Sequence, residues 1–268
     1  METMDLAYKL CLIAQRAGND IMDVKSNSKD EKAKFKGDGS PVTVADLRAH
    51  NTICTAISKL MPTIPIVSEE GLIGNPNGSE FCFVVDPLDG TKEFIKGNGM
   101  YTVNIALVKR IKKSCWKPIL GVVVAPEFET TWFGGNQVEA TRQRNGSIEK
   151  IWAGPSSIPP VVLGSVSHRT PSDERFLHAL GEHIFEGVGS SIKICRVAEG
   201  SADLSPRFGP TSCWDTAAAH AILNSAGGML IGPDGEELDY DLENRRLNPP
   251  FIAANDSRWV DFWIKHQV

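Results

Sequence analysis

The sequence predicts an α/β protein built from two lobes, an α+β N-terminal lobe over residues 1–150 and an α/β C-terminal lobe over residues 151–268. Up to about residue 60 apolar side chains recur with helical spacing, and short strand-like runs follow; after about residue 160 strand-like and helical segments alternate. Between these parts, residues 143–160 carry Gly, Ser and Pro and few large side chains, so we place the lobe boundary there.

Two helices are expected at the start of the chain. The first is predicted over residues 6–21, where apolar side chains repeat at every third or fourth position: Leu6, Leu10, Ile13, Ala17 and Ile21. The second is predicted over residues 44–60 by the same spacing, with Ala49, Ile53, Ile57 and Leu60 facing inward.

Strands are expected in the rest of the N-terminal lobe. Apolar runs bounded by turn residues predict strands at 64–67, 81–85 and 102–108, and a hairpin formed by residues 119–125 and 130–133. In the C-terminal lobe the pattern predicts strands at 161–163 and 192–197 and helices at 173–180 and 216–226.

Composition narrows the class of protein. A chain of 268 residues with 41% hydrophobic and 23% charged residues is ordinary for a globular protein. The net charge of −5 and the lack of a basic tract argue against a nucleic-acid polymer as partner. The first twelve residues lack the apolar run of a signal peptide, and no stretch approaches the length of a membrane helix, so we expect a cytoplasmic protein with no integral membrane association. The six scattered cysteines are expected to be reduced, mostly buried thiols.

Two carboxylates follow the strand predicted at 81–85. Asp86 and Asp89 lie three residues apart around a turn at Pro87, and carboxylates so close repel each other unless a cation lies between them. Mg²⁺ prefers carboxylate and carbonyl oxygens, and the carbonyl of Leu88 is available as a further ligand. The alternative is a polar turn in which Asp caps a helix.

Three further acids occur at the ends of predicted elements. Glu69 follows the strand at 64–67, Asp215 precedes the helix at 216–226, and Asp46 lies near the start of the second helix, three residues after Thr43. The alternatives are a solvated acidic loop for Glu69 and helix capping for Asp46 and Asp215, with Asp215 as the N-cap.

The order of these motifs resembles one known family. The segments at 37–46, 68–70, 86–94 and 214–215 together are similar to the inositol monophosphatase-like, lithium-sensitive phosphatases, and the resemblance runs from about residue 5 to residue 255. Within that superfamily the chain resembles the 3′(2′),5′-bisphosphate nucleotidases of the CysQ type, because Thr-Lys-Glu-Phe at 91–94 and Gly-Pro-Thr at 209–211 favour that branch. The fold implied is a layered α-β-α-β-α sandwich like that of sugar phosphatases.

The resemblance implies a magnesium site with two or three ions. Glu69, Asp86 and the Leu88 carbonyl would hold one Mg²⁺, and Asp86, Asp89 and Asp215 would hold a second. A third, weaker ion would lie near Glu69.

The resemblance also implies catalytic roles. Thr91 and Asp46 would form a hydrogen-bonded pair that orients and activates the attacking water, and Glu69 joins them as a catalytic residue. The backbone N–H groups of Gly90 and Thr91, at a turn entering a helix, would hold the phosphate.

Substrate contacts are expected from the C-terminal lobe. By the same resemblance Ser167 and His168 would contact the nucleotide, and Ser190, Lys193 and Arg207 would bind the phosphate and sugar of the substrate. Where the family often has Ser-Arg-Ser-His, residues 165–168 are Ser-Val-Ser-His, so one basic residue is absent.

The expected reaction is hydrolysis of 3′-phosphoadenosine 5′-phosphate (PAP) to AMP and phosphate. The alternatives are hydrolysis of an inositol phosphate (inositol monophosphate or inositol 1,4-bisphosphate), and, in another class, a non-catalytic binding protein on the same fold. The partner is thus a small phosphorylated molecule, with 3′-phosphoadenosine 5′-phosphosulfate (PAPS) as a further candidate. The chain is expected to be a monomer or a homodimer.

Overall fold

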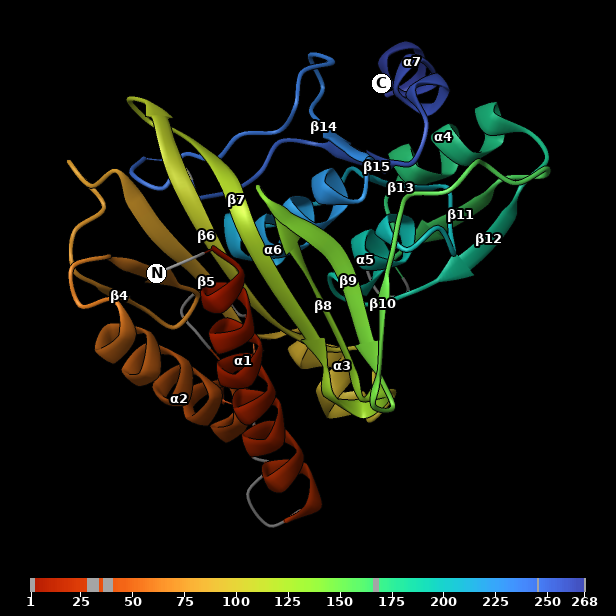
Figure 1. The fold of residues 1–268 in the computed structure, drawn as a ribbon. Coiled ribbons are helices and arrows are strands. Elements are labelled where there is room, and N and C mark those ends of the chain that lie inside the picture. Colours follow the sequence, from red (N-terminus) through yellow and green to blue (C-terminus); the bar gives the residue numbers. More distant parts are fainter. Residues whose placement is uncertain (1–2, 28–33, 36–40, 166–168, 245, 268) are drawn as a thin grey trace.

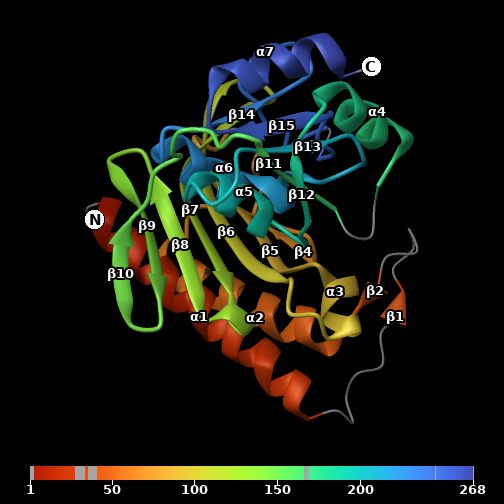
Figure 2. The same ribbon diagram turned by 90° about the vertical axis from the view of Figure 1, so that its right-hand side faces the viewer.

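The computed structural model describes residues 3–27, 34–35, 41–165, 169–244 and 246–267, arranged in five layers. Two long N-terminal helices cover one face of an eight-stranded sheet, two helices fill the space between that sheet and a five-stranded sheet, and two more helices cover the far face of the second sheet (Figures 1 and 2). This arrangement confirms the predicted α/β class and the α-β-α-β-α order of layers.

The eight-stranded sheet is mostly antiparallel. Its strands lie in the order β10-β9-β8-β7-β6-β5-β3-β4, and only β3 and β5 run parallel to each other. Their bounds are β3 Ile66–Ser68, β4 Gly71–Ile73, β5 Phe81–Asp89, β6 Thr102–Lys112, β7 Cys115–Ala125, β8 Thr130–Gly135, β9 Val138–Arg144 and β10 Ser147–Lys150. The predicted hairpin is confirmed, since β7 pairs with β8 across a short 3₁₀ turn, η1 Pro126–Phe128.

The outer helices of this sheet are α1 Thr3–Ser26 and α2 Val44–Leu60, both as predicted in type and place. Helix α2 begins at Val44 because Thr43 and Asp46 form a capping box. In it, each side chain accepts a hydrogen bond from the backbone N–H of the other residue. A short β-ladder, β1 Lys34–Phe35 with β2 Pro41–Val42, lies between the two helices in the chain.

The five-stranded sheet has the order β12-β11-β13-β15-β14. Its strands are β11 Val161–Gly164, β12 Ile184–Gly187, β13 Leu204–Arg207, β14 Met229–Ile231 and β15 Phe251–Ala254. Helices α4 Pro171–Leu180 and α7 Ser257–His266 cover its outer face, where Phe176 and Trp263 are in contact. The predicted strand at 161–163 and helix at 173–180 are confirmed.

The middle layer contains two buried helices, α5 Ile192–Ala198 and α6 Cys213–Ser225, and the short helix α3 Thr91–Lys96 follows the end of β5. The prediction of a strand at 192–197 is therefore wrong. A helix between two sheets is buried nearly all round, so Ile192, Ile194, Cys195 and Val197 show no helical apolar stripe, and a short apolar run of this kind resembles a buried strand.

The two halves of the chain share one core. Helix α6 comes from the C-terminal half but packs on β5, β6 and β7, and one apolar cluster joins Val84 and Val123 to Ala217 and Leu230. The two sheets lie on either side of residues 151–160 in the sequence, and the division into two lobes stays a prediction.

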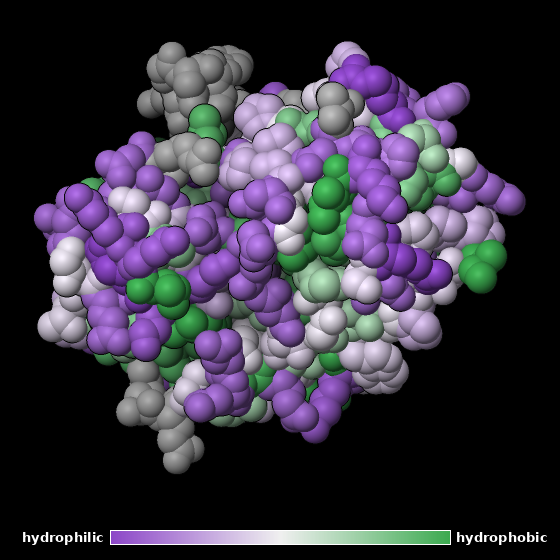
Figure 3. Space-filling model, turned by 90° about the horizontal axis from the view of Figure 1, so that it is seen from above, coloured by the Kyte–Doolittle hydropathy of each residue, from purple (hydrophilic) through white to green (hydrophobic). Residues whose placement is uncertain are grey.

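Two smaller expectations concern the surface and the thiols. All six cysteines are buried free thiols, as predicted. None of the described helices has the length and apolar character needed to cross a membrane. Seen from above, hydrophilic residues prevail on the surface and hydrophobic ones gather in small separate areas (Figure 3).

The close approach of α6 to the sheet depends on one glycine. A Cβ added to Gly121 on β7 would lie 1.9 Å from the carbonyl oxygen of Ala218 on α6. We expect Gly121→Ala to destabilise the protein by roughly 3 kcal/mol, because backbone must move to relieve the overlap. Denaturant unfolding measures this, with Gly154→Ala as the control, since its nearest neighbour would lie 3.9 Å away. Equal denaturant midpoints for the two variants would contradict this prediction, because they would show that α6 can move away from the sheet at little cost.

Candidate active site

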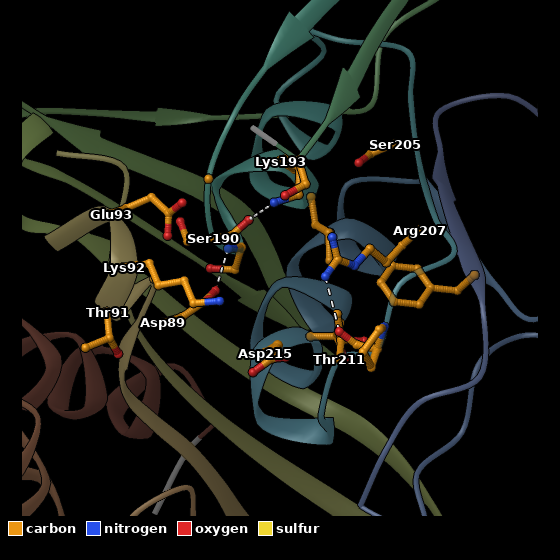
Figure 4. Close-up of a pocket in the computed structure, with 18 of the residues that line it drawn as sticks. Asp89, Thr91, Lys92, Glu93, Ser190, Lys193, Ser205, Arg207, Thr211 and Asp215 are labelled. Carbon is orange, nitrogen blue, oxygen red and sulfur yellow. Dashed lines mark hydrogen bonds between the residues drawn. The ribbon is translucent and has the colours of Figure 1, made fainter. Parts of the chain in front are cut away.

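Three carboxylates from distant parts of the chain converge at one end of the middle layer. Asp86 and Asp89 come from the last residues of β5, and Asp215 comes from the first turn of α6. Each offers an oxygen, and these oxygens lie within 4.8 Å of one another. Figure 4 shows Asp89 and Asp215 projecting from these two elements into the same cavity.

The end of β5 differs from the predicted short strand at 81–85. The strand continues to Asp89, and its pairing with β6 shifts in register between Asp86 and Asp89. This irregularity is a bulge, which re-aims side chains at a strand end. Within it the Leu88 N–H donates to Oδ1 of Asp86 at 3.0 Å.

Asp215 is not the N-cap of its helix, so that alternative is wrong. Helix α6 begins at Cys213, and Ser212 is the cap. Oδ2 of Asp215 accepts the Ser212 N–H at 2.8 Å, as the third residue of a capping box does. Asp215 thus caps through one oxygen and also belongs to the carboxylate cluster.

The cluster is electrostatically unfavourable without a cation. Burial and repulsion from neighbouring carboxylates, Glu69 first, raise the pKa of Asp86 well above its usual range. Burial raises the pKa of Asp89 to about 6 against the opposing effect of the Lys193 ammonium. Burial and then the charge of Asp89 raise the pKa of Asp215 to about 7. A divalent cation would relieve this repulsion, and the all-oxygen donor set suits Mg²⁺.

Glu69 lies beside this cluster. It follows β3, and its N–H donates to the carbonyl of Val85 on the parallel neighbour β5 at 3.0 Å. Its carboxyl group is within hydrogen-bonding reach of Asp86 and lines the same cavity. Parallel pairing of β3 with β5 therefore delivers the two acids side by side.

Thr91, the first residue of α3, is hydrogen-bonded to Asp46 on α2. The Thr91 hydroxyl donates to Oδ1 of Asp46 at 3.1 Å and is 3.3 Å from the Leu88 carbonyl oxygen. The other Asp46 oxygen accepts from Thr43, at 2.8 Å from its N–H and 2.6 Å from its hydroxyl. Burial raises the pKa of Asp46, although the Thr43 and Thr91 hydrogen bonds oppose this.

The turn before α3 requires glycine. Gly90 has a φ of +96°, and a Cβ there would lie 3.0 Å from the carbonyl oxygen of Met100. A side chain would thus be both strained and crowded, so the chain can enter α3 beside the carboxylates only with glycine at this position.

Two cationic side chains from the C-terminal half of the chain line the same cavity. Lys193, on α5, donates from Nζ to the carbonyl of Ser190 at 2.6 Å. Burial lowers its pKa to about 8, against the opposing effect of Asp89. Arg207, at the end of β13, donates from Nη2 to the Pro210 carbonyl at 3.1 Å. Ser190 has a φ of +50° and lies between Lys193 and Asp89 in Figure 4.

The cavity enclosed by these elements has a volume of about 240 Å³. Of the predicted site residues, the cavity is lined by Glu69, Asp89, Gly90, Thr91, Ser190, Lys193, Arg207 and Asp215. Asp46 and Asp86 lie buried behind them. Ser167 and His168 lie outside the described residues. The cavity is also lined by residues to which the sequence pattern assigned no contact, namely Lys92, Glu93, Ser165, Gly189, Ser191, Ser205, Pro210, Thr211, Thr216 and others.

The raised pKa values of Asp89 and Asp215 predict how the metal-free protein responds to pH. An unfolded Asp titrates near pH ~4, so between about pH 4 and pH 7 the folded state binds more protons than the unfolded state. Stability then falls as pH rises. We expect the melting temperature in EDTA to be at least ~5 °C lower at pH 8 than at pH 5.5. Saturating Mg²⁺ should remove most of this trend, and a metal-free protein more stable at pH 8 would contradict it.

Comparison with known proteins places the chain in a family. Residues 4–263 match the inositol monophosphatase family. The 3′(2′),5′-bisphosphate nucleotidase CysQ of Shigella flexneri is 43% identical over 252 residues, covering 92% of this chain and 98% of that protein. The nucleotidase of the same name from Buchnera aphidicola is 38% identical and covers 92% of each chain.

Solved structures agree with the sequence comparison. The crystal structure of CysQ from Bacteroides thetaiotaomicron superposes with a TM-score of 0.81 at 34% identity, over 95% of this chain and 98% of that one. An inositol monophosphatase from Thermotoga maritima has the same fold, with a TM-score of 0.80 at 23% identity over 100% and 97% of the two chains. The chain therefore belongs to the inositol monophosphatase family. Within that family, its relatives from Shigella and Buchnera are both 3′(2′),5′-bisphosphate nucleotidases.

Proposed function

We propose that the protein hydrolyses PAP to AMP and phosphate with the help of bound magnesium. It is an enzyme, a phosphomonoesterase of the 3′(2′),5′-bisphosphate nucleotidase type. The observation that carries the proposal is the convergence of Asp86, Asp89 and Asp215, of which Asp89 and Asp215 line a cavity that Lys193 and Arg207 also line. The protein has a net charge of −5, so a small, strongly anionic substrate needs local cations to bind. This site can supply them through Lys193, Arg207 and bound metal.

We infer that the carboxylates would hold two or three magnesium ions. Glu69, Asp86 and the Leu88 carbonyl would hold one ion, and Asp86, Asp89 and Asp215 would hold another. Bound there, the metal would neutralise the phosphate dianion, lower the pKa of water and stabilise the leaving oxygen.

Thr91 and Asp46 would position the attacking water. Because the Thr91 hydroxyl donates its proton to Asp46, its oxygen has lone pairs left to accept a hydrogen bond from a water molecule. Asp46 is held in place by Thr43 through its other oxygen, so Oδ1 stays directed at Thr91. The pair can thus orient the water and take up its proton, and Glu69 would assist from its place beside Asp86.

The remaining site residues would bind the substrate. The backbone N–H groups of Gly90 and Thr91 would hold the scissile phosphate, and Ser190, Lys193 and Arg207 would contact the phosphate and sugar beyond it. Ser167 and His168 are proposed for the same surface on the resemblance alone.

Side-by-side kinetics test the choice of substrate. We expect kcat/KM for PAP to exceed that for inositol monophosphate and inositol 1,4-bisphosphate by at least ~100-fold, because unpaired polar groups in a specific site reject the wrong substrate strongly. A larger kcat/KM for an inositol phosphate would overturn the nucleotidase assignment. PAPS belongs in the same series. Binding of PAP without turnover of any of these esters would favour the non-catalytic alternative.

Removal of metal tests the mechanism. We expect EDTA to abolish turnover, added Mg²⁺ to restore it, and Li⁺ to inhibit it. Catalysis that survives full chelation would contradict a metal-dependent reaction, because the phosphate charge would then have to be neutralised by Lys193 and Arg207 alone.

A further inference from the structure

A buried chain of hydrogen bonds ends on the Asp89 carboxylate. The Ser191 N–H donates to Oδ2 of Asp89 at 2.6 Å, and the Asn104 side chain donates to the same oxygen at 3.4 Å. The Ser191 hydroxyl donates to Oδ1 of Asn104 at 2.8 Å. The Thr102 hydroxyl lies 2.8 Å from the Ser191 hydroxyl. These residues come from β5, β6 and the start of α5, so two halves of the chain meet here.

In this series of hydrogen bonds, each donor points toward Asp89. Ser191 has one hydroxyl proton and gives it to Asn104, so Thr102 must donate to Ser191. Asn104 accepts that bond with its oxygen, which leaves its amide to donate to the acceptor-only carboxylate of Asp89. Donors aligned in one direction polarise each other, and the interior strengthens each bond.

The network is buried, and the Ser191 hydroxyl does not serve its helix as a cap. Thr102, Asn104 and Ser191 are at most 2% exposed. Ser191 is the N-cap of α5, yet its hydroxyl makes no capping bond within that helix. An N-cap serine ordinarily accepts a backbone N–H of its own helix, so the hydroxyl is diverted to Asn104.

The consequence for Asp89 is a fixed orientation. Within the described part of the chain, both hydrogen bonds to this carboxylate reach Oδ2. Rotation of the carboxylate would break both bonds and leave buried donors unsatisfied. The remaining oxygen is thereby directed away from Ser191, and Asp89 contributes to the cluster with Asp86 and Asp215.

We propose that Thr102, Asn104 and Ser191 are positioning residues that orient Asp89 for the metal and link metal binding to the substrate-contacting segment Ser190 to Lys193. The proposal rests on the metal site of the proposed function. Groups that orient a metal ligand through hydrogen bonds typically change metal affinity by 10–100-fold when removed. Because Ser191 also anchors the segment that carries Lys193, loss of the network should weaken substrate binding as well.

Thr102→Val tests the proposal, since it removes the hydroxyl and keeps nearly the same volume. Thermal stabilisation by Mg²⁺ without substrate gives an apparent metal affinity that does not depend on turnover. We expect half-maximal stabilisation to need at least ~10-fold more Mg²⁺ in Thr102→Val, and KM for PAP to rise. Thr102→Ser retains the hydroxyl and is expected to stay within threefold of the wild-type protein.

Thr130→Val is the matched control. Thr130 is also a buried threonine of the eight-stranded sheet, and its hydroxyl donates to the Phe128 carbonyl at 2.7 Å, away from Asp89. If Thr102→Val does not fold, Ser191→Ala takes its place, because it removes only one oxygen. Magnesium affinity within twofold of Thr130→Val in the variant that folds would overturn the proposal. A wild-type protein that Mg²⁺ does not stabilise would instead contradict the metal site itself.

Discussion

Replacing Asp89 with Asn is expected to lower kcat by about 10³-fold, which corresponds to losing about 4 kcal/mol of metal-derived transition-state stabilisation. Asp89 lies in the carboxylate cluster with Asp86 and Asp215, and a neutral amide is a poor ligand for a hard divalent ion. Steady-state kinetics over a range of Mg²⁺ concentrations measure the effect.

The same substitution should not unfold the protein. Because burial, with a smaller contribution from the charge of Glu69, makes the Asp89 charge unfavourable in the absence of metal, the metal-free variant should be at least as stable as the wild-type protein at pH 8. Asp234→Asn is the control, since Asp234 is exposed and lies outside the cavity. A kcat within tenfold of the wild-type value for Asp89→Asn would contradict its role as a metal ligand.

Replacing Thr91 with Ala is expected to lower kcat by about 10²–10³-fold with little change in KM, the range seen when a positioned proton acceptor is lost. Among the described residues, Thr91 supplies the only side-chain oxygen that links the cavity to Asp46 by a hydrogen bond, and its replacement leaves the carboxylate cluster intact. Thr91→Ser keeps the hydroxyl and should retain activity within about tenfold.

Metal binding separates this role from that of Asp89. Thr91→Ala should need the same Mg²⁺ concentration for half-maximal thermal stabilisation as the wild-type protein, since Thr91 is not among the clustered carboxylates. Turnover that is unchanged in Thr91→Ala, or equally low in Thr91→Ser, would exclude the hydroxyl as the group that orients water.

Local patterns predicted the outer elements well. The helix over 44–60 is confirmed at both ends, because an apolar stripe facing the sheet and the Thr43–Asp46 capping box are both encoded within a few residues. The hairpin of β7 and β8 is confirmed for the same reason, since its turn lies in four consecutive residues. The prediction failed at 192–197, where burial on all sides removes the periodicity that distinguishes a helix from a strand.

The acids of the site were also predictable, because each lies at or near an end of a strand or helix. Their grouping came from the resemblance to a known family, which the shared fold supports. The network of Thr102, Asn104 and Ser191 had no signal in the sequence. Its members are ordinary polar residues up to 89 positions apart, and nothing local distinguishes them from surface residues.

The sequence by itself determined the types of side chain available for chemistry, the caps and stripes of the outer helices, and the family resemblance through its ordered motifs. These depend on residues close together in the chain. The tertiary structure alone decided that α5 is a helix and that Asp215 is the third residue of α6, and it brings Asp86, Asp89 and Asp215 together as the resemblance implied. Packing between two sheets brings these groups together, and burial then sets their pKa values and hydrogen-bond partners, which no local pattern contains.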